Sequence, residues 1–62
     1  MDYQEAMQHV ATDHLVARMS WNGGHVRLHR KTDDGSFSWA ATRDLLPQDM
    51  LADDWYVLGT LN

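Results

Sequence analysis

The chain of 62 residues contains no cysteine and only one proline. Without cysteine it can form neither a disulfide nor a zinc site built on thiolates. A domain this short buries only roughly 60% of the surface that its unfolded chain exposes, so its core alone provides little stability. We therefore expect one domain, residues 1–62, that gains stability by forming a homo-oligomer, either a dimer or a tetramer.

Long apolar runs are also missing. No stretch has the roughly 20 consecutive apolar residues that a membrane-spanning helix needs. Residues 1–10 are too polar for a secretory signal peptide. We expect a soluble, cytoplasmic protein that does not contact a membrane.

Basic residues are absent from both ends of the chain, which segregates the charge. The net charge is −4, yet residues 18–43 hold all five basic side chains against two carboxylates, so this block alone is +3. Its basic members are Arg18, Arg27, Arg30, Lys31 and Arg43. So small a basic sector argues against duplex nucleic acid as a partner. It is enough for a small anionic ligand, although a solvated mixed-charge surface has the same composition.

The first segment has the pattern of an amphipathic helix. Asp2 can cap its N-terminus, and Glu5 follows three residues later, as in a capping box. Apolar side chains then recur at helical spacing, at Tyr3, Ala6, Met7 and Val10. This pattern predicts a helix over residues 2–12, which Thr12 and Asp13 end.

The remainder alternates with the period of strands. The pattern predicts strands over residues 15–21, 25–31, 36–40 and 55–58 and a single helical turn over residues 48–52 after Pro47. Asn22-Gly23 is the preferred pair for a two-residue type I′ hairpin turn, and Asp33-Asp34-Gly35 marks a second turn. The fold class is therefore α+β: an N-terminal amphipathic helix packed on a small antiparallel sheet, a meander of about four strands.

Catalytic motifs are missing as well. The chain has no cysteine nucleophile, no Gly-x-Ser-x-Gly elbow and no glycine-rich phosphate loop before a helix. His25 and His29 share a strand but lie about 13 Å apart there, too far to bind one ion. We expect no enzyme activity, no cofactor and no metal site.

Three tryptophans supply flat surfaces on which a purine can stack. Large aromatic residues also dominate small cores, and we expect Trp39 and Trp55 to be core residues. Trp21 stands at the predicted hairpin turn, where core packing and ligand stacking are equally good explanations. Arginines of the basic sector can bind phosphates, and Asn22 or Asp49 can bond to base edges and ribose hydroxyls.

Two motifs resemble a known family. The early motif is Arg18-x-x-Trp21-Asn22-Gly23, and the late motif runs from Asp49 to Trp55 as Asp-Met-Leu-Ala-Asp-Asp-Trp. In this order they resemble the Thoeris anti-defence sponge family, small phage proteins whose sequences typically show Arg-x-x-Trp-Asn-Gly early and Asp-Leu-Leu-Ala-x-Asp-Trp late. The resemblance spans nearly the whole chain.

This resemblance implies a phage protein that acts in the cytoplasm of an infected bacterium. It would bind and sequester a cyclic nucleotide immune signal without cleaving it, either a cyclic ADP-ribose isomer or a cyclic oligonucleotide of the related CBASS defence systems. The family forms homo-oligomers with pockets shared between subunits. Carried onto this sequence, the ligand-binding residues are Arg18, Trp21, Asn22, Gly23, Asp49, Asp54 and Trp55, to which the basic sector adds Arg27.

The chain departs from the family pattern in two places. It is shorter after Trp-Asn-Gly than typical members, and it has Ala41-Thr42 and Leu45-Leu46-Pro47 where the family usually runs Pro-Ser-Gln into the late motif. An alternative function remains open, because exposed tryptophan with arginine is also the composition of a protein interface. In that case the chain is a small protein-interaction module that inhibits a host protein.

Overall fold

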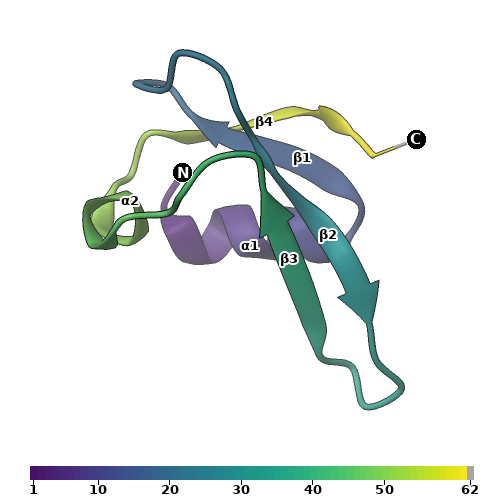
Figure 1. Cartoon of the computed structure of the whole chain (residues 1–62). Coiled ribbons are helices and arrows are strands. Elements are labelled where there is room, and N and C mark those ends of the chain that lie inside the picture. The colour runs from purple at the N-terminus through teal and green to yellow at the C-terminus, as the bar shows by residue number, and fades with distance from the viewer. Residues whose placement is uncertain (62) are drawn as a thin grey trace.

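A computed structural model describes residues 1–61 and has an α+β architecture, as the sequence predicts (Figure 1). Its elements in chain order are helix α1 (Tyr3–Ala11), strands β1 (His14–Arg18), β2 (Val26–Lys31) and β3 (Phe37–Ala41), the short helix α2 (Pro47–Leu51), and strand β4 (Trp55–Thr60). Every predicted element is present, with its ends shifted by a few residues. No helix within these residues is both long enough and apolar enough to span a membrane.

Helix α1 begins as its sequence predicts. Asp2 is the N-cap, and its Oδ1 accepts the backbone N–H of Glu5 at 2.8 Å. The helix ends before Thr12, whose side chain bonds back to the carbonyl of His9 at 3.0 Å. Asp13 then adopts a positive φ of 68°, which turns the chain directly into β1. The prediction of the helix and of its end at Thr12 and Asp13 is confirmed.

The strands form one antiparallel sheet in the order β3-β2-β1-β4. The first three strands are the predicted meander. The fourth does not continue it, because β4 pairs with β1 at the opposite edge, with Arg18 opposite Trp55 and Val16 opposite Val57. The sheet therefore has the predicted four antiparallel strands, but β4 extends it beside β1 and not beside β3. The chain returns to β1 through α2, which brings the late part of the sequence beside the early part.

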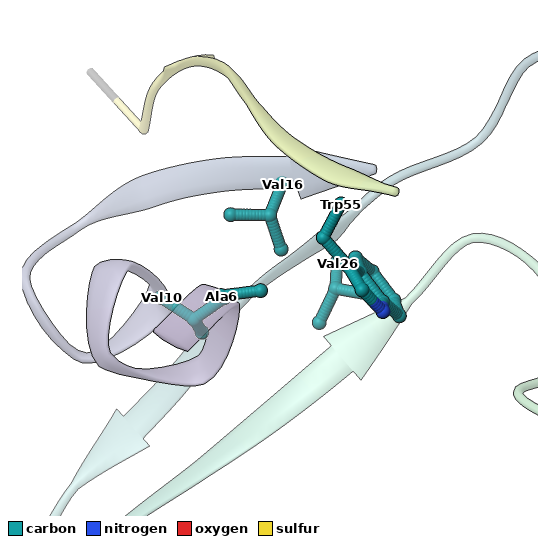
Figure 2. Close-up of a cluster of buried hydrophobic side chains, with 5 residues drawn as sticks. All are labelled: Ala6, Val10, Val16, Val26 and Trp55. Atoms are coloured by element: carbon teal, nitrogen blue, oxygen red, sulfur yellow. The ribbon is translucent and has the colours of Figure 1, made fainter. Parts of the chain in front are cut away.

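The core lies between α1 and one face of the sheet (Figure 2). Its fully buried side chains are Ala6, Val10, Val16, Val26 and Trp55. The helix contacts β1, β2 and β4, and no described helix covers the opposite face of the sheet (Figure 1). The expectation that Trp55 is a core residue is confirmed. Trp39 is not, because it lies on the edge strand β3 with 37% of its surface exposed.

The connection between β1 and β2 differs from the predicted two-residue turn. β1 ends at Arg18 and β2 begins at Val26, so the loop spans residues 19–25. A type I′ turn on Asn22-Gly23 needs positive φ at both residues, but within residues 1–61 only Asp13 among non-glycines has one, and here the positive φ values fall on Gly23 and Gly24. The loop is wider because it returns the Trp21 ring to the core, where the ring packs against Trp55.

Candidate functional site

Five of the eight predicted site residues meet at one end of the sheet. They are Arg18, Trp21, Asp49, Asp54 and Trp55, and together with Arg43 we call them the Trp21 corner. Arg18 is the last residue of β1, and Trp21 follows it in the loop of residues 19–25. Asp49, Asp54 and Trp55 come from the late motif, which α2 and the pairing of β4 with β1 place beside them. Arg43 lies between β3 and α2.

Asp49 is the centre of this corner and is only 3% exposed. Its Oδ2 accepts the backbone N–H of Leu46 at 2.8 Å, which caps helix α2. Its Oδ1 accepts Arg18 Nη1 at 2.7 Å and Trp21 Nε1 at 3.4 Å. The backbone carbonyl of the same residue accepts Trp55 Nε1 at 2.9 Å. One residue of the late motif thus joins β1, the loop, α2 and β4.

Arg18 bridges two carboxylates. Its Nε and Nη2 donate to Asp54 at 2.7 and 3.3 Å, a two-point contact, while Nη1 donates to Asp49. Such a planar fork is the geometry in which arginine binds carboxylate best. Within residues 1–61 there are two ion pairs between side chains, and Arg18 makes both of them. A ligand phosphate at Arg18 would face both carboxylates, which already neutralise the guanidinium.

The ion pairs shift the acid–base properties of all three groups. The bonds from Arg18 lower the pKa of the Asp54 carboxyl. Burial on its own raises the pKa of Asp49, but the Leu46 N–H, Arg18 and Trp21 together bring it below the usual value. In return, the hydrogen bonds to Asp54 and Asp49 raise the pKa of Arg18 above its ordinary value. All three groups are therefore charged at neutral pH.

The two tryptophans of the motifs pack against each other. Their ring centroids lie 5.2 Å apart at 74°, an edge-to-face contact. Trp55 is 2% exposed, whereas Trp21 is half-buried and reaches the surface. Trp21 is therefore the member of the pair that a ligand can contact. Its position fits both explanations weighed from the sequence, since the ring packs on Trp55 and the residue is still partly exposed.

A further arginine covers the ring of Trp21. The guanidinium carbon of Arg43 lies 4.9 Å from the ring centroid, and Arg43 Nη1 donates to the carbonyl of Gly23 at 3.2 Å. Sequence reasoning placed Arg43 in the basic sector but not in the site. No local signal identifies it, because the contact depends on how the chain after β3 meets the loop of residues 19–25.

The other predicted site residues lie outside the network of hydrogen bonds around Asp49. Asn22 and Gly23 are exposed in the loop next to Trp21. Arg27 is exposed on β2, where its register partner is Ala40. Residues 1–61 of one chain enclose no pocket and contain no cluster of three potential metal-ligating side chains. A binding surface on one chain is therefore shallow.

Comparison with known proteins gives no match: no family model, no curated protein and no solved structure is significantly similar to this chain.

Proposed function

We propose that this protein is a phage anti-defence sponge that binds a cyclic nucleotide immune signal and holds it without cleaving it. The resemblance of the two motifs suggests the class. The observation that carries the proposal is that the half-buried indole and the exposed arginine of the Trp21 corner lie next to the exposed residues Asn22 and Gly23. An aromatic ring, a cation and backbone groups are what a nucleotide needs for its base, phosphate and sugar.

The proposal includes a homo-oligomer, because residues 1–61 of one chain form no pocket. A second copy can supply the missing wall. Tyr56 and Leu58 support this, since they are 36% and 49% exposed and alternate on β4 with Val57, which packs on the core. They therefore lie on the face of the sheet that α1 leaves open. Burying such side chains between copies also provides the stability that a short chain lacks.

Sequestration works by mass action and needs no turnover. The protein lowers the free signal if it is abundant and if its dissociation constant is at or below the signal concentration. No group in the Trp21 corner is set up as a nucleophile or general base, because both carboxylates are paired with Arg18. The proposed chemistry is therefore reversible binding.

A thermal-shift panel tests the proposal. It should contain cyclic ADP-ribose isomers and cyclic di- and trinucleotides, with linear ADP-ribose and AMP as controls. A true ligand at a hundred times its dissociation constant stabilises the fold by about 2.7 kcal/mol. Mass spectrometry after heating the complex should recover the intact cyclic nucleotide. Recovery of cleaved product would identify an enzyme instead, and no shift with any cyclic nucleotide would contradict the proposal.

A second candidate function, a module that binds a host protein, is favoured by one observation. Leu46, Met50 and Leu51 around α2 are 48%, 44% and 88% exposed. Three apolar side chains on one short segment are a common feature of protein interfaces. Substituting Leu51 by Glu should abolish binding to the host partner in this case. The same substitution leaves nucleotide binding unchanged if the Trp21 corner is the site.

A further inference from the structure

We propose that Arg43, and not Arg18, is the residue of the Trp21 corner that binds the anionic group of a ligand, a phosphate or pyrophosphate. This inference rests on the proposed function for the identity of the whole ligand, but its chemistry can be tested with the anion alone. It assigns a ligand contact to a residue outside both sequence motifs.

The charge balance at the two arginines separates their roles. Arg18 donates to Asp49 and Asp54, so two carboxylates surround one guanidinium. Arg43 forms no ion pair within the described residues, and its one hydrogen bond goes to the neutral carbonyl of Gly23. The positive charge of Arg43 is therefore uncompensated by a bonded carboxylate, which is the condition an anion site requires.

The guanidinium of Arg43 is also held in place. Its carbon lies 4.9 Å from the centre of the Trp21 ring, a cation–π contact, and Nη1 is bonded to the carbonyl of Gly23. The guanidinium has further N–H groups besides the one bonded to Gly23, and its planar fork can bind two phosphate oxygens. Because the fork is oriented before the ligand arrives, binding costs less side-chain entropy.

The absence of a side chain at Gly24 leaves space for the side chain of Arg43. A Cβ atom at Gly24 would lie 2.9 Å from Cδ of Arg43 and 3.2 Å from Oγ1 of Thr42. Thr42 in turn bonds to His25, with its Oγ1 accepting the His25 N–H at 2.8 Å. The end of β3 is thereby fastened to the loop of residues 19–25, and the missing side chain at Gly24 leaves the room that Arg43 occupies. Trp21 then acts as a positioning residue for the anion, through Arg43.

The experiment is an NMR titration of the ¹⁵N-labelled full chain with inorganic pyrophosphate, following the indole N–H resonance of Trp21. Trp21→Phe identifies that resonance. In the wild type it should shift with a saturable dependence, and Arg43→Gln should weaken the apparent affinity about tenfold or more through loss of a charge-assisted bond. Arg30→Gln removes the same charge from an exposed site on β2 and should titrate like the wild type.

Arg43→Lys is the second variant. It keeps the charge but loses the planar fork, so its affinity should lie between those of the wild type and Arg43→Gln. If Arg43→Gln titrates like the wild type, or if Arg30→Gln loses as much affinity, the inference is wrong. A wild type whose Trp21 resonance does not respond to pyrophosphate also overturns it.

Cyclic nucleotide titrations separate this inference from the proposed function. If a cyclic nucleotide binds the wild type and Arg43→Gln equally well, the result supports the proposed function and contradicts the role of Arg43. If pyrophosphate binds through Arg43 but no cyclic nucleotide binds at all, the result supports the anion site and contradicts the proposed sponge function.

Discussion

Arg18 Nε lies 2.7 Å from Asp54 Oδ1, although the two residues are 36 positions apart in the sequence. This contact joins the last residue of β1 to the residue just before β4. It also joins the early motif to the late one. Both motifs can therefore be explained by the fold: their charged residues hold the sheet edge together, and their tryptophans pack behind them.

Arg18→Lys should destabilise the protein even though it preserves the charge. A lysine ammonium is a single point of contact and cannot bond to Asp49 and to both oxygens of Asp54 at once. Urea unfolding followed by circular dichroism should show a lower midpoint. Arg30→Lys is the matched control on exposed β2 and should change the free energy of unfolding by no more than about 0.5 kcal/mol. Equal midpoints for the two variants would contradict the structural role of Arg18.

Stability should fall in acid because of Asp49 and Asp54. Both carboxyls have lowered pKa values in the folded protein. Their contribution is complete above the unfolded value of about 3.9 and is lost as the pH falls below it and through the folded values. Unfolding midpoints measured from pH 2 to pH 7 test this. Asp54→Asn should flatten the acid decline, and an unchanged decline would contradict the role of this carboxyl.

Trp55→Phe should cost about 1–3 kcal/mol, since it keeps an aromatic ring in the core but removes the indole N–H bond to the carbonyl of Asp49, which retains only the longer bond from the Ala52 N–H at 3.4 Å. Trp55→Ala adds a cavity, and a cost of about 3–5 kcal/mol approaches the whole stability of a domain this small. Trp39→Phe is the control, because Trp39 is exposed at the sheet edge. Chemical denaturation of the three variants gives the comparison, and a Trp39→Phe cost as large as that of Trp55→Phe would contradict it.

Alanine at Gly23 and at Gly24 should differ in effect. Both glycines have a φ of 96°, so each substitution should cost about 1–2 kcal/mol for the left-handed backbone. A Cβ at Gly23 meets open space, whereas one at Gly24 meets the side chain of Arg43. Gly24→Ala should therefore be the more destabilising, and Arg43→Ala should reduce the difference. A difference that survives removal of Arg43 would assign the crowding to Thr42 alone.

Charging the open sheet face tests the proposed oligomer. Leu58→Glu places a carboxylate among apolar side chains that the proposal buries between copies, so it should shift the protein toward monomer in sedimentation velocity. Leu51→Glu introduces the same charge at α2 and should not. A wild type that sediments as a folded monomer at low micromolar concentration would remove the oligomer from the proposal.

Local signals predicted the elements well because each depends on neighbours in sequence. Asp2 capped α1 as expected, and Pro47 stands at the first turn of α2. The predicted two-residue turn at Asn22-Gly23 was wrong, because the packing of Trp21 on Trp55 outweighed the local preference of the Asn-Gly pair. The position of β4 beside β1 likewise depends on contacts across the chain, which no periodicity reveals.

The candidate site was predicted in part for the same reason. The motifs identified Arg18, Trp21, Asp49, Asp54 and Trp55, and the structure brings these five together. They did not indicate that Asp49 is buried and caps α2. The residues around Asp49 do not show from the sequence alone that its carboxylate is buried. The motifs did not identify Arg43, because its contact with the Trp21 ring depends on how two loops meet in the fold.

The pairing of β4 with β1 has a consequence for the integrity of the Trp21 corner. Asp54 lies just before β4, Trp55 is its first residue, and β4 forms an edge of the sheet. When this edge strand is detached, Arg18 loses Asp54 and the indole of Trp21 loses its contact with Trp55. Any binding at the Trp21 corner would therefore report that β4 is docked on β1.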